Sequence, residues 1–549
     1  MRPYTIAKSA FLTSLLPVTM ILACSSDSAS SGGPDGGGAT TSTGGKSSDG
    51  SGGKSATGGK AGATSTGGTA PSSGGGTGGE TNPADASTGG GGDTDSGTGG
   101  ADTDGGDAGE PGPGLTPLVN ALSTTGPDRF YGVTTDAKGN VYAVGQIADS
   151  TDTTADFSVL VAKFTALGVL DTTFGTKGFV TRNVVTGTNG ELYRGIVVQS
   201  TGKIVVSGQA EHAGAADVRD RDMVVLRFNP DGTKDTTFGT DGVLTLDLST
   251  GALNGTAFSA DSAWGLVAYA DDRLVVSGGK VRSGGVDTDF VLVRLSKDGV
   301  LDDAFGDHGV FELDTMQNGM SNNASPRNVT LLPGTDGIIG AGYQPIPGAD
   351  TGPVVYKVTD AGKLDTTFGT DGVFSDRPLT EQTETYMAAV QPAASGTGYS
   401  LVTTGYGRQL DTETTDIVSL RLTSAGKLDT TYGTAGVARI DIGGFGDNSR
   451  RLAVLPDRSV LLVGGGRLTS ADVDGTFVKL TADGQPDTTF APKGFRTVDL
   501  GGPADFLWSV ALTPDKKFAV AAGISGVGAT PTPATLNDDT TLVLLPLTQ

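Results

Sequence analysis

The sequence from about residue 127 onward is built from short apolar runs, each closed by a cluster of Gly, Asp and Thr. One cycle of runs reads 195–198, 203–208, 222–228 and 242–246, and the same order recurs along the chain. β-Branched residues dominate these runs and many alternate with polar residues, which predicts strands. No segment keeps an apolar period of about 3.6 residues. We therefore expect an all-β domain with four strands in each cycle.

A phrase reading LDTTFG punctuates the cycles and recurs six times with small changes. Successive copies lie 58 to 67 residues apart, a period that suits a four-stranded propeller blade with long loops. We expect its Asp to accept backbone N–H bonds at the head of a turn, its aromatic ring to enter the core and its Gly to adopt a left-handed conformation. The Asp and aromatic positions are Asp171, Phe174, Asp235, Phe238, Asp302, Phe305, Asp365, Phe368, Asp429, Tyr432, Asp487 and Phe490.

The sixth copy departs from the phrase, with Pro486 in place of Leu and Ala491 followed by Pro492 in place of Gly-Thr. We expect its turn to be built differently. The pattern LDTTFGTDGV resembles the delta-60 repeat family of bacterial surface and secreted proteins, over most of residues 127 to 500. The resemblance implies a β-propeller-like domain of unassigned activity, and it brings no catalytic residue with it.

The number of blades follows from paired first and second strands. The second strands end at Gly145, Gly208, Gly278, Gly342, Gly405, Gly464 and Gly523, which predicts a seven-bladed propeller of four-stranded blades. The last cycle stops at Gln549 without a fourth strand, whereas residues 117–122 form an unmatched apolar run before the first cycle. We expect this N-terminal strand to close the last blade, because closure removes open sheet edges. The propeller is predicted to span residues 115–549.

The N-terminus has the layout of a secretory leader, with Arg2 and Lys8 ahead of an apolar run from Ala10 to Leu22. Ile21 to Cys24 resembles a bacterial lipobox, which implies a lipoprotein signal peptide over 1–23, lipidation of Cys24 and an outer-membrane or cell-surface location. Residues 24–114 are rich in Gly, Ser and Thr and lack large apolar residues after Cys24. Such a segment cannot bury apolar surface, so we predict a disordered tether.

Composition excludes several chemistries. The chain has 61 acidic and 38 basic residues, which argues against a nucleic-acid partner. Cys24 is the only cysteine, so the domain has no disulfide or thiol catalysis. His212 and His308 are the only histidines, and we interpret both as loop or turn residues. We expect no cofactor. Carboxylates are too frequent for spacing to select a metal site or a catalytic pair.

Two functions remain open. The first is a surface-tethered binding or adhesion module, a monomeric propeller that contacts the membrane through its lipid alone and takes an unknown extracellular ligand. The second is an extracellular propeller enzyme, such as a glycan lyase or hydrolase, with carboxylates at the channel mouth. We favour the binding module, because no recognisable catalytic set is present.

One position at the start of each first strand alternates between aromatic residues and arginine. In a propeller, equivalent positions form a ring, so each guanidinium would lie near aromatic rings of adjacent blades. Such a ring would either join the blades or provide a site for a sugar or an anionic ligand. The alternative is a set of unrelated residues whose long stems cover blade edges. The positions are Tyr131, Arg194, Trp264, Arg327, Tyr386, Arg450 and Trp508.

Overall fold

The computed structural model describes the chain from residue 116 to residue 547. The residues left out within this range are 124, 152–154, 187–190, 212–219, 250–258, 282–286, 316–323, 336, 348 and 527–537. The predicted leader and tether and His212 therefore lie outside the described residues. All regular structure in the described part is β-strand, as predicted. Within that part, no helix is long and apolar enough to cross a membrane.

The strands follow one another as antiparallel meanders of four. The first two meanders are β2 (Asp128–Thr135), β3 (Val141–Ile147), β4 (Ser158–Phe164), β5 (Phe179–Arg182), and β6 (Leu192–Val198), β7 (Ile204–Glu211), β8 (Asp220–Phe228), β9 (Val243–Leu246). The third follows the short β10 (Ser259–Ala260) and contains β11 (Ser262–Ala268), β12 (Leu274–Val281), β13 (Thr288–Leu295), β14 (Val310–Leu313). Two more share one sheet: β15 (Ser325–Leu331), β16 (Ile338–Ile346), β17 (Ala349–Val358), β18 (Val373–Phe374), and β19 (Gln382–Pro392), β20 (Tyr399–Arg408), β21 (Asp416–Thr423), β22 (Val437–Ile440). The sixth meander is β23 (Asn448–Val454), β24 (Val460–Gly466), β25 (Asp474–Leu480), β26 (Phe495–Val498). The last contains β27 (Phe506–Leu512), β28 (Phe518–Ser525), β29 (Asp539–Pro546), and its fourth strand is β1 (Thr116–Asn120), which pairs with β29.

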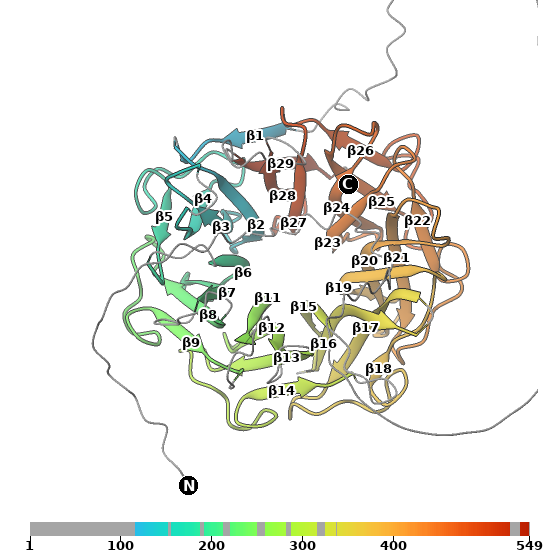
Figure 1. The fold of residues 1–549 in the computed structure, drawn as a ribbon, viewed down its shortest axis with the longest axis horizontal. Helices are drawn as coiled ribbons and strands as arrows, with labels where there is room; N and C mark the ends of the chain where they lie inside the picture. Colours follow the sequence, from blue (N-terminus) through green and yellow to red (C-terminus); the bar gives the residue numbers. More distant parts are fainter. Residues whose placement is uncertain are drawn as a thin grey trace, which may run out of the picture. The chain divides into compact units, whose positions relative to one another are not determined.

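The first strand of each meander lies innermost and the fourth lies outermost, around a common centre (Figure 1). Each first strand contacts the first strand of the next meander, from β2 through β6, β11, β15, β19 and β23 to β27. β27 in turn contacts β2. The eight-stranded sheet consists of two meanders joined by one parallel pair, Thr351 with Gln382. The arrangement is that of a β-propeller.

The hydrophobic core lies between consecutive meanders. Val205 and Val225 of one meander, for example, pack with Leu266, Val276 and Val293 of the next. The strands in the middle of each sheet are buried on both faces, which explains why their runs are almost wholly apolar. Packing of this kind repeats around the centre, so each meander depends on both neighbours for its buried surface.

The strand before the first meander pairs with the last strand of the chain. β1 runs antiparallel to β29, with Leu118 opposite Leu542 and Pro117 opposite Val543. The Thr540 hydroxyl also donates to the Asn120 carbonyl at 2.6 Å. Leu118 packs against the cluster that contains Leu542. The sheet of β27, β28 and β29 is therefore four-stranded because a segment from the other end of the domain joins it.

Candidate functional site

A β-bulge interrupts every first strand at the position where the sequence alternates between aromatic residues and arginine. Between Phe130 and Gly132, for instance, the pairing of β2 with β3 skips Tyr131. A bulge leaves its extra residue unpaired and redirects its side chain. The skipped residues in the other first strands are Arg194, Trp264, Arg327, Tyr386, Arg450 and Trp508. The seven residues therefore share one local geometry.

The structure brings these seven side chains into one closed series of contacts, called here the central ring. The guanidinium carbon of Arg194 lies 3.7 Å from the ring centroid of Trp264 and 5.9 Å from that of Tyr131. Arg327 lies 4.1 Å from Trp264 and 4.8 Å from Tyr386, and Arg450 lies 4.1 Å from Tyr386 and 5.4 Å from Trp508. Tyr131 and Trp508 close the series edge to face, with centroids 5.2 Å apart. All six guanidinium distances are within the range of cation–π attraction.

A second layer of aromatic residues supports part of the ring. The Arg327 guanidinium donates from Nη2 to the hydroxyl of Tyr343 at 2.5 Å and lies 4.8 Å from its ring centroid. Arg450 lies 5.5 Å from the ring centroids of both Tyr406 and Phe506. Arg327 and Arg450 are buried, whereas Trp264 and Trp508 are only partly covered. The ring thus has an enclosed side, and its two tryptophans keep some exposure.

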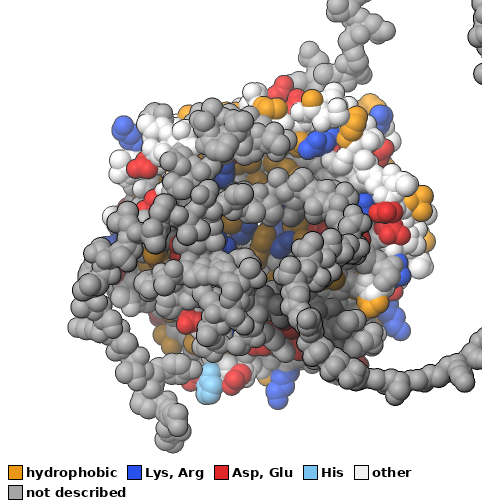
Figure 2. Space-filling view, viewed as in Figure 1, with side chains coloured by type: hydrophobic (Ala, Val, Ile, Leu, Met, Phe, Trp, Pro, Cys, Tyr) orange, Lys and Arg blue, Asp and Glu red, His pale blue; other side chains and the backbone are white. Residues whose placement is uncertain are grey.

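Arg451 occupies the middle of this arrangement, and the sequence analysis missed it. It follows the bulged Arg450 on β23, a position at which β2, β6 and β11 carry Gly132, Gly195 and Gly265. At Gly132 an added Cβ would meet the Arg194 carbonyl oxygen at 2.2 Å, so the backbones are too close there for a side chain. Arg451 instead extends to the opposite side, where its Nη2 donates to the Trp264 carbonyl at 3.3 Å. Figure 2 shows Lys or Arg and apolar side chains gathered at the centre of this face.

In five of the blades, a buried carboxylate lies three residues before the ring residue, at or just before the start of the first strand. These residues are Asp128, Glu191, Asp261, Asp447 and Asp505. Each accepts main-chain N–H bonds from the segment that leaves the preceding meander; Asp447, for example, accepts from Ile442 at 2.8 Å. Burial raises the pKa of Asp128 to about 6 and that of each of the other four to about 7, although these hydrogen bonds oppose the shift. These five carboxylates join consecutive blades near the start of each first strand.

Aspartates gather near three of these carboxylates and at one further junction. Oxygen atoms of three residues lie within 4.8 Å of one another in each group. The groups are Asp222, Asp247, Asp261; Asp287, Asp289, Asp314; Asp416, Asp441, Asp447; and Asp474, Asp499, Asp505. Carboxylate oxygens are ligands that Ca²⁺ and Mg²⁺ prefer. In the described residues, however, Asp261, Asp447 and Asp505 already use their oxygens to hold backbone N–H groups.

The LDTTFG turns are held by a cation on the third strand of the same blade, eight residues before the Asp. Asp235 accepts from Arg227 Nε at 2.6 Å and from the Thr237 hydroxyl at 2.6 Å. In the same turn, Phe238 is fully buried and Gly239 has a left-handed φ of 54°. The equivalent pairs are Lys163–Asp171, Arg294–Asp302, Lys357–Asp365, Arg421–Asp429 and Lys479–Asp487. The constant spacing was a signal that sequence inspection could have found.

Hydrogen bonds within these turns lower the pKa of Asp171 and Asp365. The hydrogen bond from Lys163 is the largest influence on Asp171 and holds its pKa at about 2. At Asp365 the hydrogen bonds from Thr367 and Lys357 have the same result. The turns also reach the next blade, because Gly433 donates its N–H to the Asp483 carbonyl at 2.8 Å. The repeat phrase is therefore a structural joint.

Two departures from the repeat are visible. In the sixth copy Phe490 is only partly buried and the Ala491 N–H donates back to Asp487, so this turn is built differently after its aromatic residue. His308 is 84% exposed and has a φ of 49°, like the equivalent Lys177 and Asp241. It is a turn residue whose neighbours Asp303 and Asp307, at 3.4 and 3.9 Å, are equally exposed to solvent.

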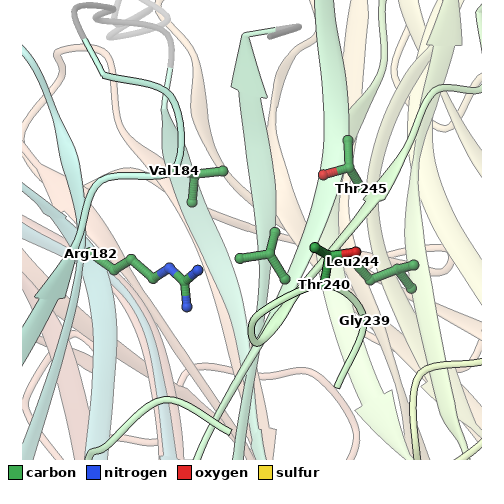
Figure 3. A pocket seen from close by; sticks show the side chains of 7 residues that line it. Arg182, Val184, Gly239, Thr240, Leu244 and Thr245 are labelled. Carbon is green, nitrogen blue, oxygen red and sulfur yellow. The ribbon is translucent and has the colours of Figure 1, made fainter. Parts of the chain in front are cut away.

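A cleft of about 390 Å³ lies on the outer side, between the segment after β5 and the strand β9 (Figure 3). Arg182 lies at one end of it and Thr240, Leu244 and Thr245 lie at the other. The Arg182 guanidinium is engaged, since Nη1 donates to the Asp241 carbonyl at 2.7 Å. The cleft thus lies at a joint between neighbouring blades, away from the central ring.

Comparison with known proteins supports a β-propeller family. Residues 199–238 match the model described as "Domain of unknown function (DUF5122) beta-propeller". The matched segment begins directly after β6, contains β7 and β8, and ends in the second LDTTFG turn. No curated protein matches the sequence.

Solved structures similar to this chain share little sequence with it. U3-55K has 10% identity and a TM-score of 0.38, with 80% of this chain and 100% of that chain covered. The polysaccharide lyase Uly1 has 10% identity and a TM-score of 0.42, covering 78% and 92%. The NanB sialidase from Streptococcus pneumoniae has 10% identity and a TM-score of 0.37, covering 78% and 69%. At such low identities and TM-scores, nothing about those proteins' ligands or activities carries over.

Proposed function

We propose that this protein is a surface-tethered binding module whose ligand site is the central ring. The closed series of alternating arginine and aromatic contacts is the observation that supports it. Aromatic faces stack on the apolar faces of sugars, and guanidinium groups bind carboxylate or sulfate groups in a forked geometry. Glycans and other anionic ligands therefore suit this site best.

The proposed architecture is a seven-bladed propeller of the delta-60 repeat type, closed by its N-terminal strand. Two observations support this count and closure. Each first strand contacts the next until β27 meets β2, and β1 completes the sheet of β29. Closure of this kind gives every blade four strands, so each ring residue lies on the first strand of a complete sheet.

The tether and anchor complete the proposal. Residues 1–23 act as a lipoprotein signal peptide, Cys24 carries the lipid, and residues 24–114 hold the propeller away from an outer-membrane surface. Metabolic labelling with palmitate tests this directly. The intact protein should be labelled, and the Cys24→Ser variant should not; a label that survives the substitution would rule out the anchor.

Binding at the ring is tested by a glycan array followed by Trp264→Ala. We expect a hit on the wild-type domain and at least a tenfold loss of affinity in the variant, which should remain folded. The matched control is Phe495→Ala, which removes a partly exposed aromatic residue beside Lys493 on the outermost strand β26, away from the ring. Equal losses in both variants, or no hit at all, would count against the ring as a site.

The alternative of a propeller enzyme depends on the aspartate groups at the blade junctions. In three of the four groups a buried member, Asp261, Asp447 or Asp505, holds backbone N–H groups and ties consecutive blades together, which is a structural task. We therefore place the ligand at the ring and assign the carboxylates to the scaffold.

A further inference from the structure

Arg451 carries a charge that the described part of the protein does not balance. Its Nη1 donates to the carbonyls of Arg450 and Tyr386 at 3.3 and 3.5 Å, and its Nη2 donates to the carbonyl of Trp264 at 3.3 Å. These distances lie beyond the usual range for N–H···O bonds. No carboxylate of the described residues forms an ion pair with Arg451. Arg451 is partly buried, and a guanidinium that is partly withdrawn from water without a counter-charge is costly.

The neighbours of Arg451 make this cost larger. Burial, and then the like charges of Arg327 and Arg450, lower the pKa of Arg451 to about 10. Arg327 and Arg450 belong to the central ring, so several cationic groups converge on one place in a chain that is strongly acidic as a whole. A bound anion would reduce the repulsion among them.

A second donor in the ring also lacks an acceptor. The indole Nε1 of Trp508 is buried and makes no hydrogen bond to any described residue. Its ring lies 5.2 Å from Tyr131 and 5.4 Å from the Arg450 guanidinium, measured to ring centroids. An unsatisfied buried N–H and an unbalanced guanidinium in the same region both call for an acceptor that the described residues do not supply.

We propose that the centre of the ring binds one oxyanion, a carboxylate or a sulfate group, with Arg451 as its charged partner. The proposal rests on the proposed function, because it uses the same site, and it adds the chemical class of the ligand. The planar fork of a guanidinium matches two oxygens of either group, and the aromatic rings around it accommodate a flat sugar ring that carries the group. The source is a free ion or an acidic glycan.

The protein offers a direct readout for this site. Its two tryptophans, Trp264 and Trp508, are both members of the central ring. Fluorescence excited at tryptophan therefore reports on the ring alone. We would titrate the full-length protein at constant ionic strength with sulfate, acetate, glucuronate and a sulfated oligosaccharide, and compare Arg451→Met and Arg451→Lys with Arg467→Met. Arg467 is the matched control, since its guanidinium donates to the Ser470 carbonyl away from the ring.

We expect a saturable fluorescence change in the wild type and in Arg467→Met, and a loss of affinity of at least about tenfold in both Arg451 variants. Saturation by sulfate or acetate identifies a free-ion site, whereas saturation by the oligosaccharide alone identifies an acidic glycan. The absence of saturation with every anion, or equal affinity in wild type and Arg451→Met, would overturn the proposal. If anions fail to bind but neutral glycans still bind and lose affinity in Trp264→Ala, the oxyanion proposal is wrong and the proposed function of the ring stands.

Melting temperatures give an independent check, because they can be compared even if the Arg451→Met variant binds no ligand. In anion-poor buffer, removal of an unbalanced charge should leave the melting temperature unchanged or raise it. Added sulfate should then raise the melting temperature of the wild type more than that of the variant. A lower melting temperature of Arg451→Met in every buffer, by the same amount, would show that Arg451 only fills the centre.

Discussion

Arg450 shows how single residues hold the centre together. Its guanidinium lies 4.1 Å from the centroid of Tyr386 and within 5.5 Å of those of Tyr406, Phe506 and Trp508. These rings come from β19, β20 and β27, so one side chain on β23 contacts both neighbouring blades. Cation–π contacts of this kind contribute about 0.5 to 2 kcal/mol each.

Replacing Arg450 with Lys keeps the charge but removes the planar face that stacks on these rings. We expect the free energy of unfolding to fall by about 1 to 3 kcal/mol, measured by urea denaturation. Arg467→Lys, at a part-exposed position, should change it by less than about 0.5 kcal/mol. Similar values for both variants would mean that the ring does not join the blades.

Glu191 shows how burial sets the pH response of the domain. It is 1% exposed, accepts N–H bonds from Val184 and Val185, and accepts from the Tyr193 hydroxyl at 2.8 Å. Burial raises its pKa to about 7, above the ordinary value of 4.5. The folded protein therefore binds a proton more tightly than the unfolded chain, and this contribution to stability is complete below pH 4.5 and is lost as the pH rises through 7.

The Glu191→Gln variant should remove that part of the pH dependence, because Gln keeps an acceptor oxygen and does not titrate. We expect the difference in unfolding free energy between wild type and variant to shift by about 3 kcal/mol against the wild type from about pH 4.5 to about pH 7.5. Urea denaturation at a series of pH values measures it. A constant difference across this range would show that Glu191 does not titrate there.

At the scale of elements, the LDTTFG turn and the third strand before it act together. Arg227 on β8 and Asp235 in the turn are almost completely buried, whereas Lys163 and Asp171 in the first blade are partly exposed. The charges and the sequence spacing of the two pairs are the same, but their exposure to solvent differs. A buried pair leaves an expensive charge behind when one partner is removed, and an exposed pair does not.

We therefore predict that Asp235→Asn destabilises the domain by about 3 to 5 kcal/mol, and that Asp171→Asn costs about 1 kcal/mol or less. Both values come from urea denaturation near neutral pH, where both aspartates are ionised. The same cost at both positions would contradict the dependence on burial.

Across the whole domain, its two ends meet in one sheet. β1 supplies the outermost strand beside β29, and its Leu118 packs against the cluster around Leu542. Without β1, the main-chain groups of β29 would face solvent along an open edge, which is also a site for pairing with other chains.

Deletion of residues 115–123 should lower the melting temperature by several degrees and increase association at high concentration. Scanning calorimetry and light scattering measure the two effects. A deletion of equal length within 24–114 is the matched control and should change neither. An unchanged melting temperature in the first deletion would refute the closing role of this strand.

The sequence by itself determined the elements that depend on neighbouring residues: the strands, the turns and their repetition. Alternation and turn chemistry are local, so they can be read without knowing the fold. The repeat also pointed to the seven ring positions, because equivalent residues in equivalent blades face the same axis. Tertiary structure alone decided the rest. The bulges that redirect the ring residues, the burial that separates Asp235 from Asp171, and the reach of Arg451 to Trp264, 187 residues away, all depend on how distant strands pack together. Those contacts are set by geometry between blades, which no local pattern in the chain encodes.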